Sequence, residues 1–113
     1  MITILLVDDE PEILDLYSAV VKEGLGVHVV TATCAEDAIQ VISKGCIKVI
    51  LSDVDMPGKS GVALTQEVKA AYSDIFIILM SARPEPEGHV ADAFLQKPFH
   101  NREVLETIKA LIG

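Results

Sequence analysis

Five stretches of this chain are almost continuously apolar and rich in Val, Ile and Leu. They cover residues 2–7, 27–32, 48–52, 75–80 and 93–96. A strand with one wet face alternates apolar and polar residues, whereas a strand that is covered on both faces reads as a continuous apolar run. The pattern therefore predicts five buried strands.

The segments between these runs carry apolar residues at helical spacing, and their ends carry helix start and stop signals. Pro11 suits a first helical position, and Thr33 with Glu36 resembles a capping box. Four long helices are therefore expected: from Pro11 to Gly24, between Thr33 and Gly45, from Ser60 or Gly61 to about Ala71, and after Asn101.

Strands that alternate with helices imply right-handed crossovers and a parallel sheet, because parallel neighbours cannot be joined by a tight hairpin. The expected fold is one α/β domain over residues 1–113, a doubly wound five-stranded parallel sheet with the flavodoxin-like strand order 2-1-3-4-5. In this order, ligands bind beyond the carboxyl ends of the first and third strands, where the strand order reverses.

One connection departs from the regular alternation. Only residues 81–92 join the fourth strand to the fifth, and Pro84 and Pro86 lie in the first half of this segment. Proline removes a backbone donor and biases the preceding residue away from helical angles. We therefore expect a shortened fourth helix, from about Glu87 to Ala91, that lies between these two strands.

Composition excludes several classes of protein. The formal charge of −8 opposes binding to nucleic acid, whose affinity for proteins is built largely on Lys and Arg. No apolar stretch approaches the ~20 residues that cross a bilayer, and no basic and apolar leader precedes Ile2. Cys34 and Cys46 are too few for a disulfide scaffold. We expect a cytoplasmic protein with free thiols that binds neither nucleic acid nor membrane directly.

Four of the expected strands end at residues that can bind a phosphate or a divalent cation. These residues are Asp8 and Asp9, Asp53, Ser81 and Lys97. Parallel strands bring their carboxyl ends to one edge of the sheet, so these side chains should converge. Three adjacent carboxylates repel one another, and without a cation at least one should have a raised pKa. The all-oxygen ligand set favours Mg²⁺.

Such a site suits phosphoryl transfer, because a carboxylate can act as the nucleophile and form an aspartyl phosphate. Lys97 would neutralise charge on the phosphoryl group, and Ser81 would donate a hydrogen bond to it. Taken singly, Asp9 could instead cap the next helix, and Lys97 could be a solvated loop residue. Complementary chemistry at four strand ends favours the phosphate and metal site.

Over its whole length the sequence resembles the receiver domains of two-component response regulators. The resemblance rests on LLVDDEP, LSDVDMPGKSG, MSAR and LQKPF, which occur in the expected order. It implies that Asp53 receives a phosphoryl group from a phosphohistidine on a histidine kinase or a histidine phosphotransfer protein. It also implies a signalling module, not a turnover enzyme, in which phosphorylation shifts a two-state equilibrium.

The same resemblance implies a ligand set for Mg²⁺. Asp9 and Asp53 would bind the ion directly, the backbone carbonyl of Asp55 would be a third ligand, and Asp8 would act mainly through water. The Lys97–Pro98 peptide bond would be cis.

Further roles concern the switch. Ser81 and Lys97 would contact the phosphoryl oxygens, and Phe94 matches the family's aromatic switch, with a plain core phenylalanine as the alternative. Asp55 and Arg83 lie where they could tune dephosphorylation. Receivers usually carry a full helix before the fifth strand, and many use it for output. Its reduction here favours a hybrid histidine kinase or a phosphorelay setting.

A hydrolase is the rival interpretation. Asp53, Val54 and Asp55 match the D-x-D motif of haloacid-dehalogenase-type phosphatases, in which the first Asp attacks phosphate and the second acts as acid and base. In those enzymes the motif follows the first strand, whereas here it follows the third. A degenerate receiver that only binds partners usually lacks an acidic residue or the lysine, and this chain lacks neither.

Overall fold

The computed structural model describes residues 2–113, and Met1 of the expected domain lies outside the described residues. The chain forms a five-stranded sheet in the order β2-β1-β3-β4-β5, with every neighbouring pair parallel. The predicted strand order is therefore confirmed. In chain order the elements are β1 (Thr3–Val7), α1 (Pro11–Leu25), β2 (His28–Ala32), α2 (Ala35–Ser43), β3 (Ile47–Asp53), α3 (Gly61–Ala71), β4 (Phe76–Ser81), β5 (Ala93–Gln96) and α4 (Asn101–Ile112).

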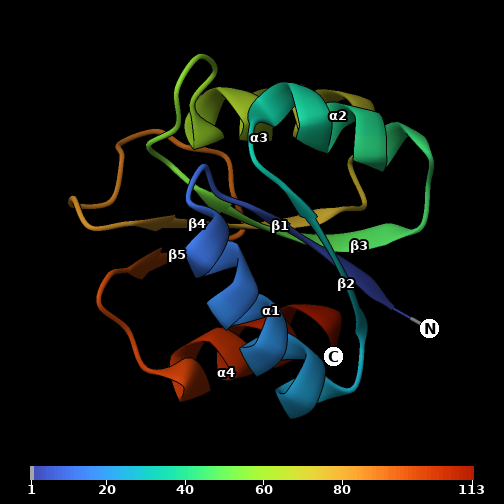
Figure 1. Cartoon of the computed structure of the whole chain (residues 1–113). Helices are drawn as coiled ribbons and strands as arrows, with labels where there is room; N and C mark the ends of the chain where they lie inside the picture. The colour runs from blue at the N-terminus through green and yellow to red at the C-terminus, as the bar shows by residue number, and fades with distance from the viewer. Residues whose placement is uncertain (1) are drawn as a thin grey trace.

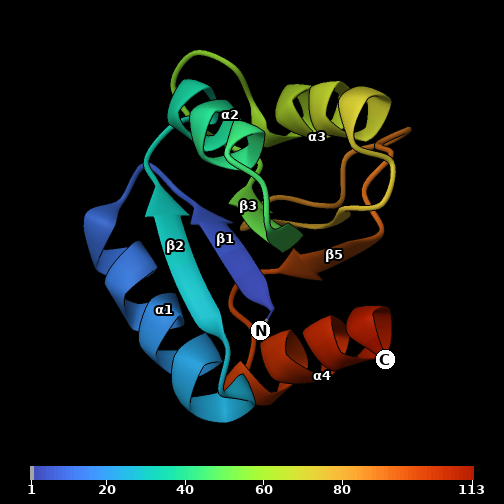
Figure 2. The same ribbon diagram turned by 90° about the vertical axis from the view of Figure 1, so that its right-hand side faces the viewer.

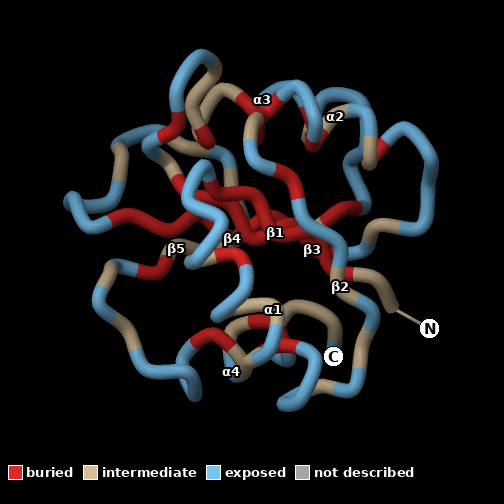
Figure 3. The backbone as a smooth tube through the Cα atoms, viewed as in Figure 1, coloured by how far each residue is buried: buried red, intermediate tan, exposed pale blue. Residues whose placement is uncertain are grey.

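The helices cover the sheet in two layers. Helices α2 and α3 lie on one face and α1 and α4 on the other (Figures 1 and 2). The central strands are consequently buried on both sides, while the outer surfaces of the helices are exposed (Figure 3). The apolar side chains form two clusters, one containing Leu5 and Ile50 with α2 and α3, the other containing Ile4 and Leu51 with α1 and α4.

Two helix ends differ from the predictions for local reasons. Helix α1 continues past Gly24 to Leu25, and its C-cap is Gly26, which has a left-handed φ of 64°. Gly24 lies inside the helix where α4 packs closely, and a Cβ at this position would lie 2.6 Å from the side chain of Leu105. The predicted capping box of Thr33 and Glu36 is wrong, since Cys34 is the N-cap of α2 and makes no side-chain cap.

The connection between β4 and β5 contains no helix. The prediction of a shortened helix from Glu87 to Ala91 was wrong, because only a turn at Glu87 and Gly88 forms there. Gly88 has a φ of 70°, which is incompatible with a continuing right-handed helix. The N–H of Ala91 donates to the ring of His89 at 3.1 Å, not to a carbonyl one turn earlier.

Side-chain contacts fix this helix-free connection to the rest of the domain. Asp92 accepts a hydrogen bond from the N–H of Ile77 at 2.8 Å and pairs with Lys69 of α3 at 2.7 Å. Lys69 also donates to the carbonyl of Ile75 at 2.8 Å. Strand β5 is therefore tied to α3 and β4 without a helix between them.

Two further observations concern the cysteines and the helices. Cys34 and Cys46 are free thiols. Within residues 2–113, every helix is too short or too polar to cross a bilayer.

Candidate functional site

The carboxyl ends of the strands bring four of the predicted residues to one edge of the sheet. Asp8 follows β1, Asp53 ends β3, Ser81 ends β4 and Lys97 follows β5. The relative exposures of Asp8, Asp53 and Ser81 are 1%, 7% and 1%. Lys97 Nζ lies 3.5 Å from Asp8 Oδ2 and 3.9 Å from Asp53 Oδ1. One ammonium group thus lies close to two buried carboxylates.

The acidic segment after β1 forms a carboxylate cluster. One oxygen from each of Asp8, Asp9 and Glu10 lies within 4.8 Å of the other two. Asp53 is not a member of this cluster. Glu10 was missed as a candidate, although the run of three acidic residues was a visible signal.

One buried oxygen of Asp8 makes no hydrogen bond, although the Lys97 ammonium lies 3.5 Å from it. Its Oδ1 accepts a hydrogen bond from the N–H of Glu10 at 3.0 Å. Its Oδ2 is buried and, alone among the buried side-chain polar atoms of residues 2–113, lacks a hydrogen-bond partner. An unsatisfied buried carboxylate oxygen is costly, and it suits a bound cation or its water shell. The hard oxygen donors on this edge fit Mg²⁺.

Asp53 is positioned by the close approach of α3 to the end of β3. Gly61 is the first residue of α3, and its N–H donates to the carbonyl of Val54 at 2.9 Å. A Cβ on Gly61 would lie 2.2 Å from the carbonyl oxygen of Asp53. Ser60 caps the helix by accepting from the N–H of Ala63 at 3.2 Å. Glycine at position 61 therefore lets α3 begin directly against the backbone of Asp53.

The pKa of Asp53 is raised above its ordinary value, and burial is the largest cause. Lys97 lowers this pKa, whereas the negative charge of Asp8 raises it. The sequence predicted a raised pKa from repulsion between carboxylates. The direction is confirmed for Asp53, but burial contributes more than repulsion does.

This raised pKa makes a prediction about stability. A carboxyl group whose pKa is raised in the folded state stabilises the fold below about pH 4, and that contribution is lost as pH rises through the folded-state pKa. Asp53→Asn should therefore raise the Tm at pH 7, measured without divalent cations, by a few degrees. The gain should shrink as the pH approaches about 4. An equal gain at both pH values would contradict this explanation.

Asp55 connects the loop after β3 to the end of β4. Its Oδ2 accepts from the hydroxyl of Ser81 at 3.0 Å and from Arg83 Nε at 3.4 Å, and its Oδ1 pairs with the other end of the guanidinium. The hydrogen bond from Arg83 is the largest cause that lowers the pKa of Asp55, and the bond from Ser81 lowers it further. The sequence placed Arg83 near the site but did not identify its partner.

Aromatic residues lie on both sides of Lys97. Phe94 is partly buried and belongs to neither apolar cluster. Its ring centroid lies 6.4 Å from that of His89. Phe99 stacks on Tyr17 of α1, with centroids 5.3 Å apart, and the Lys97–Pro98 peptide bond is cis. The stacked pair fastens the segment after β5 to α1, and sequence reasoning missed it.

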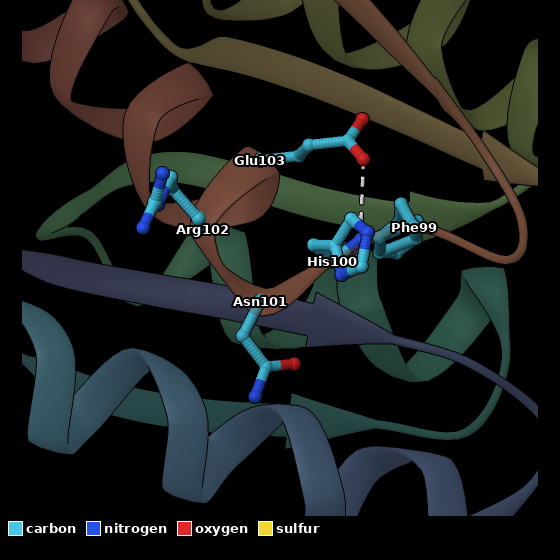
Figure 4. A pocket seen from close by; sticks show the side chains of 5 residues that line it. All are labelled: Phe99, His100, Asn101, Arg102 and Glu103. Atoms are coloured by element: carbon cyan, nitrogen blue, oxygen red, sulfur yellow. Dashed lines mark hydrogen bonds between the residues drawn. The ribbon is translucent and has the colours of Figure 1, made fainter.

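A surface pocket of about 650 Å³ lies at the start of α4 (Figure 4). It is lined by residues 99–103, and the N–H of His100 donates to the Glu103 carboxylate at 3.2 Å. None of the residues predicted for the phosphate and metal site lines this pocket. The candidate site is therefore the carboxylate edge, not this hollow.

The chain is similar to known proteins in both sequence and fold. The family described as response regulator receiver domain matches residues 4–109. The transcriptional regulatory protein CpxR homolog of Haemophilus influenzae is 34% identical over 99% of this chain and 51% of its own length. The phosphate regulon transcriptional regulatory protein PhoB of Pseudomonas aeruginosa is 34% identical over 97% of this chain and 51% of its own length. The chain spans about half the length of the curated relatives it matches.

Solved structures share the whole fold. Response regulator protein TrrA of Thermotoga maritima, solved in complex with Mg²⁺-BeF, is 32% identical, with a TM-score of 0.91 and coverage of 98% of this chain and 99% of its own. Chemotaxis protein CheY4 of Vibrio cholerae is 28% identical, with a TM-score of 0.90 and coverage of 98% of both chains.

Proposed function

This chain belongs to the response regulator receiver domain family of two-component signalling, and we propose that its Asp53 accepts a phosphoryl group from a phosphohistidine on a partner protein. The partner would be a histidine kinase or a histidine phosphotransfer protein. The observation that carries the proposal is the position of the Lys97 ammonium, within 4 Å of the buried carboxylates of Asp8 and Asp53. A receiver domain is a signalling module and not a classical enzyme.

The proposed step transfers the phosphoryl group from the partner's histidine to Asp53. A carboxylate oxygen of Asp53 forms a bond to phosphorus while the bond between phosphorus and the histidine nitrogen breaks, and the imidazole leaves with its electron pair. Lys97 offsets the negative charge that the phosphoryl group brings next to Asp8. Phosphoryl transfer depends mainly on positioning of the reacting groups and on charge stabilisation. On this edge, Asp53 would be the positioned nucleophile and Lys97 would stabilise the charge.

Residues of the same edge would hold Mg²⁺. Asp9, Asp53 and the backbone carbonyl of Asp55 would be its protein ligands, and Asp8 would act mainly through water. The unsatisfied Oδ2 of Asp8 and the carboxylate cluster of Asp8, Asp9 and Glu10 support an ion at this place. When bound, Mg²⁺ neutralises charge on the phosphoryl oxygens. That TrrA was solved with Mg²⁺-BeF agrees with this assignment.

Phosphorylation would act as a switch. Ser81 would turn its hydroxyl towards the phosphoryl oxygens, and Phe94 would change position as Ser81 does. A partner surface would then read the difference between the two states. Action within a hybrid histidine kinase or a phosphorelay stays a prediction. The same holds for the expectation that the chain does not contact nucleic acid or membrane directly.

A phosphatase of the haloacid-dehalogenase type is disfavoured by the surroundings of Asp55. That mechanism needs the second acid of the D-x-D motif to give and take a proton. Both oxygens of Asp55 are engaged by Arg83, one of them also by Ser81, and its pKa is lowered. A carboxylate held ionised in this way is a poor proton donor.

Incubation with Mg²⁺ and a small acyl phosphate tests the proposal directly. We expect the intact mass to show one added phosphoryl group that hydroxylamine removes, as an acyl phosphate requires. Chelation of Mg²⁺ should suppress the adduct. If the folded protein gains no adduct, the proposed function fails. Sustained release of phosphate from varied phosphomonoesters would favour the phosphatase instead.

A further inference from the structure

The hydroxyl of Ser81 is fully engaged in this structure, and not with Asp53. It donates to Asp55 Oδ2 at 3.0 Å and accepts from the N–H of Arg83 at 3.0 Å. Ser81 is only 1% exposed, so water offers it little alternative. Phosphoryl oxygens are acceptors, so a phosphoryl group on Asp53 would have to compete with Asp55 for the single O–H proton of Ser81.

Arg83 orients the carboxylate that holds Ser81. Its guanidinium contacts both oxygens of Asp55, which fixes the carboxylate plane. The Arg83 side chain is 76% exposed and that of Asp55 is 39% exposed. An ion pair so open to water contributes little stability by itself. Its effect is to aim Oδ2 at the Ser81 hydroxyl.

The backbone keeps these partners in reach of one another. Asp53 pairs with Met80 in the β3–β4 register, and the N–H of Val54 donates to the carbonyl of Met80 at 2.9 Å. The loop that carries Asp55 and the end of β4 are thus joined just before Ser81. Ser81 can exchange its partner by turning its side chain or by shifting the end of β4.

We propose that Asp55, oriented by Arg83, is a latch that holds the Ser81 hydroxyl away from Asp53 until a phosphoryl group displaces it. This inference rests on the proposed function of the same site. Asp55 is then a positioning residue, because it acts through Ser81. A ligand shifts a two-state equilibrium only by its differential affinity for the two states. The latch lowers the free energy of the unphosphorylated state and so weakens the response to a phosphoryl group.

A double-mutant cycle isolates this latch. The affinity of Mg²⁺ with beryllofluoride, the ligand pair present in the TrrA structure, is measured by calorimetry on the wild type, Asp55→Ala, Ser81→Ala and the double variant. We expect Asp55→Ala to tighten binding by roughly three- to tenfold, as for loss of a partly exposed hydrogen bond to a carboxylate. In the Ser81→Ala background the gain should fall below about twofold, because the latch has no hydroxyl to hold.

The cycle separates the latch from simple charge repulsion. Removing the negative charge of Asp55 would favour an anionic ligand equally in both backgrounds, so equal gains would overturn the latch. Weaker binding by Asp55→Ala would overturn it as well. If none of the four folded proteins binds beryllofluoride, the proposed function itself fails. Arg83→Ala should tighten binding less than Asp55→Ala does, and the exposed Arg102→Ala is the matched control that should leave it unchanged.

Discussion

Replacing Asp53 with Asn should eliminate the acyl phosphate adduct, with a loss on the order of a hundredfold or more in its yield. The substitution removes the nucleophilic oxygen while keeping the volume of the side chain. Asp8 shares the Lys97 ammonium with Asp53, but it follows β1, whereas Asp53 ends β3. Intact-mass measurement after a fixed incubation with Mg²⁺ and acyl phosphate provides the test.

Asp55→Asn is the matched control, because it removes a carboxylate only two residues away. The adduct should persist on this variant, since Asp55 touches Ser81 and Arg83 and is not the acceptor. An undiminished adduct on Asp53→Asn would move the phosphoacceptor elsewhere. If Asp55→Asn instead accumulates the phosphoryl adduct and no longer releases phosphate from phosphomonoesters, the result would point to the D-x-D phosphatase.

The second large effect is expected from Gly61→Ala. Alanine normally stabilises a helix relative to glycine by roughly 1 kcal/mol. Here the added Cβ would lie 2.2 Å from the carbonyl oxygen of Asp53 and 3.0 Å from the Cα of Val54. These are backbone atoms of β3 and its following loop, and they cannot turn aside. We expect the steric cost to win, with a net loss of about 2–3 kcal/mol in the free energy of unfolding.

Gly24→Ala is the control for that substitution. Its Cβ would meet only the end of the Leu105 side chain, at 2.6 Å, which can change rotamer. The gain in helix propensity should offset part of the cost, so its loss should be clearly smaller than that of Gly61→Ala. Urea unfolding of both variants measures the difference. Equal losses in the free energy of unfolding would mean that the contact of α3 with the Asp53 backbone is no more rigid than the contact of Gly24 with Leu105.

The central strands β1, β3 and β4 follow from the sequence because burial on both faces leaves an unbroken apolar run. The edge strand β2 was expected to be buried as well, but it is largely exposed. The convergence of Asp8, Asp53, Ser81 and Lys97 follows in turn, because each directly ends or follows such a run. Those inferences need only the direction of each strand. They do not depend on which way any side chain turns.

Other features depend on contacts that no local pattern records. Gly24 lies within α1 against Leu105, a contact between residues far apart in sequence that the glycine stop signal does not reveal. The hydrogen bond from Ser81 to Asp55 joins residues 26 positions apart and depends on a rotamer. The proline pattern indicated that a full helix before β5 is disfavoured, but the shortened helix predicted there does not form. It did not reveal that Gly88 and His89 would remove the helix altogether.

Strand β5, which no helix directly precedes, is the part of the sheet that we expect to open first when the domain is heated. Strand β5 has four residues, is the shortest strand described, and lies at an edge of the sheet. Such a segment opens by local unfolding at a smaller free-energy cost than the core strands. Lys97 follows it directly, so this opening would carry the ammonium away from Asp8 and Asp53 while the other strands stay folded. Warming should therefore disable phosphoryl transfer before it melts the domain.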